Sequence, residues 1–124
     1  MKYKRHENFE KQFKKLNKRY RSLEDDLKIA EKAAIELCHV YGIDNNAVEL
    51  VPKFDFEKVK IYKIKKFACK SLFGKGVRSG IRVTYAFYPE LMLVEYLEIY
   101  YKEKNNSDMD YVFAKNYCKN FLDK

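Results

Sequence analysis

The 124-residue sequence predicts an α+β fold, because its helical patterns precede its strand patterns and do not alternate with them. Apolar residues recur every three or four positions in the first third of the chain, whereas residues after 58 alternate with a period of two. We predict one domain over residues 1–124. It would contain a short N-terminal strand, a two-helix hairpin, a three-stranded antiparallel sheet and a C-terminal helix.

The first strand and the helical hairpin are expected in residues 1–42. Residues 1–5 alternate weakly, as a short strand would. The first helix is indicated by an apolar stripe at helical spacing, which consists of Phe9, Phe13, Leu16 and Tyr20. Ser22 and Asp25 resemble a capping box that opens the second helix. Gly42 would supply the left-handed conformation that ends it.

The sheet is expected after a connector at residues 44–55, which Asn45, Asn46 and Pro52 interrupt. Residues 59–61 and 62–66 place their apolar side chains in opposite phases, which indicates a bulge or twist between them. The clearest strand contains the alternating residues Ile81, Val83, Tyr85 and Phe87.

The last strand and the last helix complete the predicted fold. In residues 93–101, Leu97 and Ile99 are expected to face the core, while Glu98 and Tyr100 face outward. A final helix is expected after Ser107, with an apolar stripe of Ala114, Cys118 and Phe121.

Positive charge is concentrated in residues 58–89, which contain nine Lys or Arg residues and no acidic residue. The rest of the chain has 17 basic and 18 acidic residues. A surface of one sign attracts polyanions, whereas a surface that only confers solubility usually mixes both signs. The alternation places Lys63, Lys65 and Arg82 on the sheet face that the helices are expected to leave open.

Several classes of protein are disfavoured by the composition. Cys38, Cys69 and Cys118 are odd in number and widely spaced, which is typical of free thiols in a reducing compartment and not of a disulfide framework or a zinc site. No apolar stretch approaches the length of a membrane span, and the N-terminus lacks the apolar core of a signal peptide. We therefore expect a cytoplasmic protein with no metal, no cofactor and no membrane partner.

The available side chains favour phosphate chemistry over conventional acid–base hydrolysis. His6 and His39 have no second ligand at metal spacing, and no pair of catalytic carboxylates stands out. RNA cleavage can use the 2′-hydroxyl of the substrate as nucleophile, so the protein needs to position the phosphate and stabilise its charge. Arg, Lys and Tyr suit that task. The alternative is that the lysines are ordinary solvated residues of a strand.

Two segments resemble the central strand pair of the RelE/ParE toxin superfamily: Tyr62-Lys63-Ile64-Lys65 and Ser79-Gly80-Ile81-Arg82-Val83-Thr84-Tyr85. The segment from Ser22 to Leu27 resembles the opening of the second helix of this family. The segment from Glu98 to Lys102 is similar to its last strand. The resemblance covers most of the chain and reproduces the order of elements derived above.

The resemblance implies the toxin of a toxin–antitoxin pair, neutralised by a cognate antitoxin. In the mRNA-cleaving branch, such a toxin enters the ribosome and cuts mRNA without a metal. Lys63 and Lys65 match positions that stabilise phosphate charge, with either lysine as the base, and Arg82 matches a residue that clamps the scissile phosphate. Tyr111 matches a family tyrosine if two residues are inserted, and Tyr100 competes with it.

Other residues of the chain would extend the RNA contact. Lys102 or Lys104 stands where the family has an arginine after the last strand. Lys66, Lys75 and Arg78 lie in an insertion between the two matching strands, where they would contact phosphates or simply solvate the loop. Two alternatives remain open: a ParE-like inhibitor of DNA gyrase, and a non-catalytic nucleic-acid-binding relic of the family.

Overall fold

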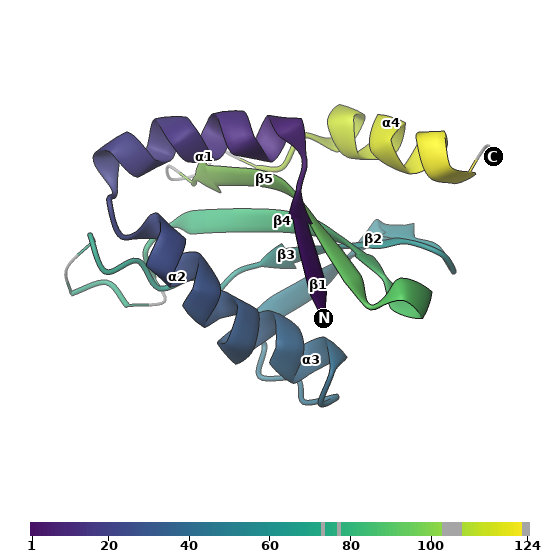
Figure 1. Ribbon diagram of the computed structural model, residues 1–124, viewed down its shortest axis with the longest axis horizontal. Helices are drawn as coiled ribbons and strands as arrows, with labels where there is room; N and C mark the ends of the chain where they lie inside the picture. Colours follow the sequence, from purple (N-terminus) through teal and green to yellow (C-terminus); the bar gives the residue numbers. More distant parts are fainter. Residues whose placement is uncertain (73, 77, 103–107, 123–124) are drawn as a thin grey trace.

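The computed structural model describes residues 1–72, 74–76, 78–102 and 108–122 (Figure 1). For residues 121 and 122 it describes the backbone only. The elements, in chain order, are β1 (Lys2–Arg5), α1 (Glu7–Arg19), α2 (Leu23–Ala30), the π-helical segment η1 (Glu31–Glu36), α3 (Leu37–His39), β2 (Val48–Asp55), β3 (Lys60–Ile64), β4 (Ile81–Tyr88), the 3₁₀ turn η2 (Pro89–Leu91), β5 (Leu93–Tyr101) and α4 (Tyr111–Leu122).

The described strands form one five-stranded sheet in the order β1-β5-β4-β3-β2. β1 is parallel to β5, and the other neighbours are antiparallel. The α+β class is confirmed, and so is the short first strand. The predicted three-stranded sheet is wrong, because β1 and β2 extend the antiparallel core at its two edges.

β2 occupies most of the segment that the sequence predicts as a connector. Its pairing with β3 shifts register between Leu50 and Asp55, and Pro52 lies within that irregular stretch. Proline lacks the N–H needed for a central strand, but an edge strand tolerates it at an irregular position. The proline that was interpreted as a breaker therefore marks an edge.

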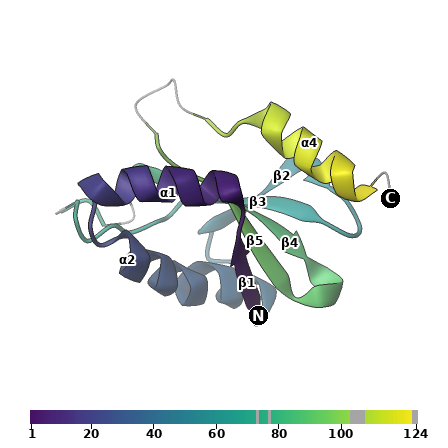
Figure 2. The ribbon, with the colours of Figure 1, turned by 45° about the horizontal axis from the view of Figure 1, so that its top comes forward.

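Both faces of the sheet carry an apolar core. The first core lies under α1 and α2 and includes Phe9, Leu23, Leu27, Ile64, Val83 and Tyr85. The second lies under α4 and includes Val59, Ile61, Ala86, Leu97, Ala114 and Cys118. Figure 2 shows α2 and α4 on opposite sides of the sheet. The expectation of one open face is therefore wrong for the half that α4 covers.

The second core also explains the change of phase in β3. This strand pairs with β4 without a register shift, and the predicted irregularity lies instead in its pairing with β2, between Tyr62 and Lys60. Ile61 belongs to the second core and Ile64 to the first. Both phases are apolar because both faces of β3 are buried, as in strands that are covered on two sides.

A bulge also occurs in β5. Thr84 of β4 lies opposite Glu98, but the next residue of β4 lies opposite Tyr96, so Leu97 is the extra residue. Leu97 packs in the second core, whereas Ile99 packs in the first. The prediction that these two residues share a face is therefore wrong.

The helix ends differ in part from the prediction. The hydroxyl of Ser22 donates to Asp26 Oδ2 at 2.6 Å and makes no capping hydrogen bond, so the predicted capping box is wrong. Gly42 has a φ of 69°, which confirms the left-handed end of the helical hairpin. α4 begins at Tyr111, where Asp110 Oδ1 accepts a hydrogen bond from the N–H of Phe113 at 3.0 Å.

The apolar side of α4 is confirmed by the burial of Ala114 and Cys118. Ser107 and the side chain of Phe121 lie outside the described residues. At the opposite edge of the sheet, α1 continues along β5 where β1 ends. Asn8 Nδ2 donates to the carbonyl of Leu97 at 3.1 Å, and the N–H of Ile99 donates to Gln12 Oε1 at 3.0 Å. Two α1 side chains thus satisfy an otherwise open strand edge.

Candidate nucleic-acid interface

The strand register brings several of the candidate residues onto one face. Lys63 of β3 lies opposite Thr84 of β4, and Thr84 lies opposite Glu98 of β5. One step along the same face, Arg82 lies opposite Tyr100. Directly opposed residues share a face of the sheet. Lys63, Arg82 and Tyr100 therefore form a strip across three adjacent strands, which we call the Lys63–Arg82 strip.

Tyr111 reaches the Lys63–Arg82 strip through Asp108. Lys63 Nζ donates to Asp108 Oδ1 at 2.8 Å, and the side chain of Lys63 is only 18% exposed. The hydroxyl of Tyr111 donates to the other oxygen of Asp108 at 3.4 Å. The hydrogen bond from Lys63 lowers the pKa of Asp108 below its usual range, so Asp108 is a carboxylate.

Glu98 is a buried carboxyl group at the edge of the Lys63–Arg82 strip. It is 4% exposed, and it accepts hydrogen bonds from the Thr84 hydroxyl at 3.1 Å and from the N–H of Asp110 at 3.2 Å. Burial raises the pKa of Glu98, although both of these hydrogen bonds oppose the rise. Glu98 therefore ties the segment before α4 to the sheet.

Tyr100 and Arg82 form the more accessible end of the strip. Burial raises the pKa of Tyr100, the carboxylates of Asp108 and Glu98 raise it further, and Arg82 opposes them. The phenol therefore stays protonated and available as a hydrogen-bond donor. Arg82 Nη1 donates to its neighbouring carbonyl, Ile81 O, at 3.2 Å. Within the described residues, Arg82 has no carboxylate within 4.0 Å and can take up an anion.

Lys65 and Lys66 follow directly after β3 and point to different partners. Lys65 keeps the alternation of Lys63 and lies 3.7 Å from Glu49 Oε2. Lys66 Nζ donates to the carbonyl of Asn45 at 3.3 Å. Both side chains are exposed. Lys65 therefore extends the strip toward β2, whereas Lys66 lies away from it.

Lys75 and Arg78 lie on a loop that is fastened to the start of α2. The N–H of Ser71 donates to Ser22 Oγ at 2.9 Å, and the N–H of Lys70 donates to Asp26 Oδ1 at 3.2 Å. Figure 1 shows this loop beside the turn between α1 and α2. Lys75 and Arg78 are exposed there, and no described contact joins either to the Lys63–Arg82 strip.

Lys102 is exposed at the end of β5, and its N–H donates to the carbonyl of Gly80 at 2.7 Å. Gly80 has a φ of 85°, and a Cβ there would lie 3.4 Å from the Tyr101 ring. The positive φ next to Arg82 therefore favours glycine, whereas the Cβ distance alone is an ordinary contact. Lys104 lies outside the described residues.

Both histidines have structural partners. His6 Nδ1 accepts a hydrogen bond from the N–H of Asn8 at 3.0 Å, which caps α1. His39 Nε2 lies 2.8 Å from the Tyr85 hydroxyl, and its ring stacks on Phe87 with centroids 4.0 Å apart. In the described part of the chain, no cluster of three His, Cys, Asp or Glu side chains could hold a metal ion.

Sequence reasoning missed Glu98 and Asp108 as members of the site. Glu98 was expected on the outer face, and its position in a strand rich in apolar residues was the available signal. Asp108 was not among the candidate residues of the sequence analysis. The result is a strip of cationic and phenolic donors bordered by carboxylates. A phosphodiester offers the acceptors that these donors require.

No family model and no curated protein sequence matches the chain. Among solved structures, a chain of the archaeal RelE–RelB complex from Pyrococcus horikoshii OT3 matches with a TM-score of 0.50 and 14% identity. The match covers 86% of this chain and 97% of that chain. The chain has a RelE-like fold. In the described part of this RelE-like chain, no helix has the length and apolar character needed to cross a membrane.

Proposed function

We propose that this chain is the toxin of a toxin–antitoxin pair, and that it acts in the cytoplasm as a metal-independent, ribosome-dependent mRNA endoribonuclease. The RelE-like fold supports the first part, and the similar structure comes from a RelE–RelB complex, which supports a cognate antitoxin as partner. The observation that carries the RNA-cleaving part is the strand register that puts Lys63, Arg82 and Tyr100 on one face.

The chemistry requires no cofactor. The 2′-oxygen of the substrate attacks the adjacent phosphorus, and the bond from phosphorus to the 5′-oxygen breaks. Water takes the proton of the 2′-hydroxyl and supplies a proton to the departing 5′-oxygen, which gives a 2′,3′-cyclic phosphate and a 5′-hydroxyl. The protein contributes positioning and stabilisation of the negative charge that develops on the phosphate oxygens.

The residues of the strip divide this work. Arg82 offers two parallel N–H groups to the phosphate oxygens. Lys63 forms an ion pair with Asp108, so it supplies positive charge beside the phosphate. The incoming phosphate takes the place of Asp108 as the partner of Lys63. Tyr100 and Tyr111 flank the phosphate, where they stack on bases or donate to oxygens.

Induced expression in a bacterial host, with primer extension on cellular mRNA, tests this proposal. We expect growth arrest and new cleavage sites, and we expect Arg82→Ala and Lys63→Ala to lower cleavage by about 10²–10³-fold each, as the loss of one charge-stabilising donor does elsewhere. Lys58→Ala is the matched control, because Lys58 lies in the same acid-free run but is exposed at the far end of the sheet.

Three outcomes would contradict the nuclease. Growth arrest without new mRNA ends, unchanged by Arg82→Ala, would reject RNA cleavage. An inhibited supercoiling reaction would then favour a gyrase inhibitor. Folded protein that binds RNA without arresting growth would favour a non-catalytic module. Co-purification with the product of a neighbouring small acidic reading frame tests the antitoxin separately.

A further inference from the structure

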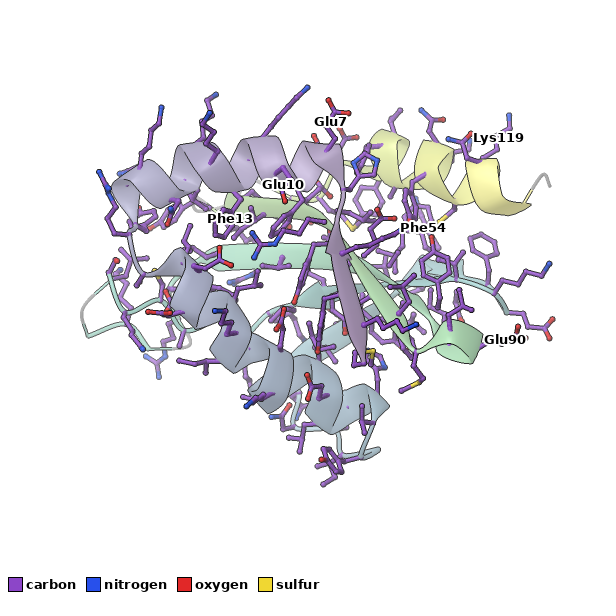
Figure 3. All side chains as sticks on the ribbon, viewed as in Figure 1. Glu7, Glu10, Phe13, Phe54, Glu90 and Lys119 are labelled. Carbon is purple, nitrogen blue, oxygen red and sulfur yellow. The ribbon has the colours of Figure 1, made fainter. Side chains whose placement is uncertain are left out.

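A second acid-free run lies in residues 11–21, which contain six Lys or Arg residues and no Asp or Glu. Five of them belong to α1 and are exposed: Lys11, Lys14, Lys15, Lys18 and Arg19. Figure 3 shows nitrogen-tipped side chains that project from α1 away from the sheet, while Phe13 points into the core. This helix therefore presents a cationic outer surface over an apolar inner one.

The charge on α1 is less compensated than the charge near the strip. Among the described residues, one cation of α1 has an ion-pair partner, Lys11 with Glu7 at 3.7 Å. By contrast, the run at residues 58–89 has three paired cations: Lys60 with Asp55, Lys63 with Asp108 and Lys65 with Glu49. An ion pair cancels most of the field that its cation would exert on an approaching polyanion.

A shallow groove connects α1 to the Lys63–Arg82 strip. It has a volume of about 360 Å³ and is lined by Gln12, Lys15, Leu16, Arg19, Ile99 and Tyr100. Lys15 and Arg19 are one helical turn apart, so they lie on the same side of α1. Tyr100 belongs both to this groove and to the strip, because it lies opposite Arg82. The two surfaces are therefore continuous.

We propose that this groove binds the stretch of single-stranded RNA that flanks the phosphate held by the Lys63–Arg82 strip. Lys15 and Arg19 contact backbone phosphates, Tyr100 offers its ring to a base, and the partly buried Leu16 accepts a ribose or base face. This inference rests on the proposed function, since it extends the same site along the same strand of RNA.

Fluorescence anisotropy with a labelled single-stranded RNA tests the groove without cleavage, if every ribose is 2′-O-methylated to block the nucleophile. We expect the double variant Lys15→Gln/Arg19→Gln to bind about tenfold more weakly at moderate salt. Two lost phosphate contacts should also make the plot of log Kd against log salt concentration shallower by about 1.4. The matched control is Lys28→Gln/Lys32→Gln, which removes the same charge from exposed positions on the neighbouring helical segment.

Equal effects of the two double variants would overturn the proposal, because they would show a response to net charge alone. Tighter binding of a poly-glutamate peptide than of RNA, with the same loss in the α1 variant, would also overturn it in favour of an acidic protein partner. Both proposals are upheld if Arg82→Ala loses cleavage and the double variant Lys15→Gln/Arg19→Gln still binds RNA more weakly than its control. If neither Arg82→Ala nor Lys63→Ala alters cellular mRNA, while the α1 variant still binds weakly, only the nuclease fails.

Discussion

Single carboxylates decide which cations of this protein can receive a polyanion. Lys63 faces Asp108 and Lys65 faces Glu49, whereas Arg82 is free of acidic neighbours within the described residues. Ion pairs at a solvated surface contribute at most about 1 kcal/mol, so a phosphate can displace the carboxylate without a large cost. Under the proposed function, we therefore expect Arg82 to make the first contact with an anion, and Lys63 to make a second contact after it exchanges Asp108 for the anion.

His39 shows how burial of a single titratable group makes stability depend on pH. Burial lowers the pKa of His39 from 6.5 to about 4, so the unfolded chain takes up a proton in this window that the folded chain does not. The contribution of neutral His39 to the free energy of unfolding is fully present above 6.5, its pKa in the unfolded chain. It is lost as the pH falls toward 4. We expect a loss of about 2 kcal/mol, after allowance for solvent screening of the partly exposed ring.

Urea unfolding above pH 6.5 and near pH 4 measures this loss. His39→Phe is the comparison, because a phenyl ring can keep the stacking on Phe87 but cannot titrate. The difference between the two proteins cancels the contributions of other groups, including Glu31 and Glu98. The interpretation fails if both proteins lose the same stability on acidification.

Among the elements, the loop between β3 and β4 is held by the start of α2. Asp26 is 2% exposed and accepts hydrogen bonds from the Ser22 hydroxyl and from the N–H of Lys70. Phe67 and Cys69 bury their side chains in the first core. Part of the insertion that was predicted to extend the RNA contact therefore packs in the first core. Lys75 and Arg78, which are exposed, remain candidates for contact with RNA.

Asp26→Ala should release this loop, because it leaves two part-buried donors, the Ser22 hydroxyl and the N–H of Lys70, without this acceptor. We expect a loss of about 2–3 kcal/mol of stability and faster tryptic cleavage at Lys70, Lys75 and Arg78. Asp25→Ala is the matched control, since Asp25 is the exposed neighbour on the same helical turn. Equal tryptic rates in the two variants would mean that Asp26 does not hold the loop.

For the molecule as a whole, the candidate site depends on the docking of α4. The segment before α4 brings Asp108 to Lys63, and the first residue of α4 is Tyr111. The second core holds this helix on the sheet through residues such as Leu97 and Cys118. Burial raises the pKa of Cys118 to about 11, so the docked thiol is both covered and protonated.

Leu97→Ala should loosen α4, since it removes a side chain that is 1% exposed from the second core. We expect a loss of about 2–4 kcal/mol and faster alkylation of Cys118, followed by peptide mass spectrometry. Leu91→Ala serves as the control because Leu91 is 64% exposed on the turn before β5. If Leu97→Ala destabilises the protein but Cys118 remains as protected as in Leu91→Ala, Leu97 does not hold α4.

Local sequence patterns were sufficient to predict a helix or strand where the spacing of its own apolar residues determines its structure. The helical stripe at Phe9 and Phe13 and the alternation from Ile81 to Phe87 were predicted correctly. The sequence also placed Lys63 and Arg82 on one face, because alternation and strand order fix that relation. The unused signal was the acid-free run at residues 11–21, which the near-neutral total outside residues 58–89 concealed.

The sequence by itself determined the α+β class, the order of the main elements and the phase of β4, because these depend on side-chain periodicity over a few residues. Only the tertiary structure decided that α4 packs on the second face, that Leu97 is a bulge, and that Asp108 and Glu49 face the lysines. Those features arise from pairs far apart in the chain, which no local pattern encodes. The sequence therefore gives the number of positive charges, whereas the fold shows which cations of the described residues have a carboxylate beside them.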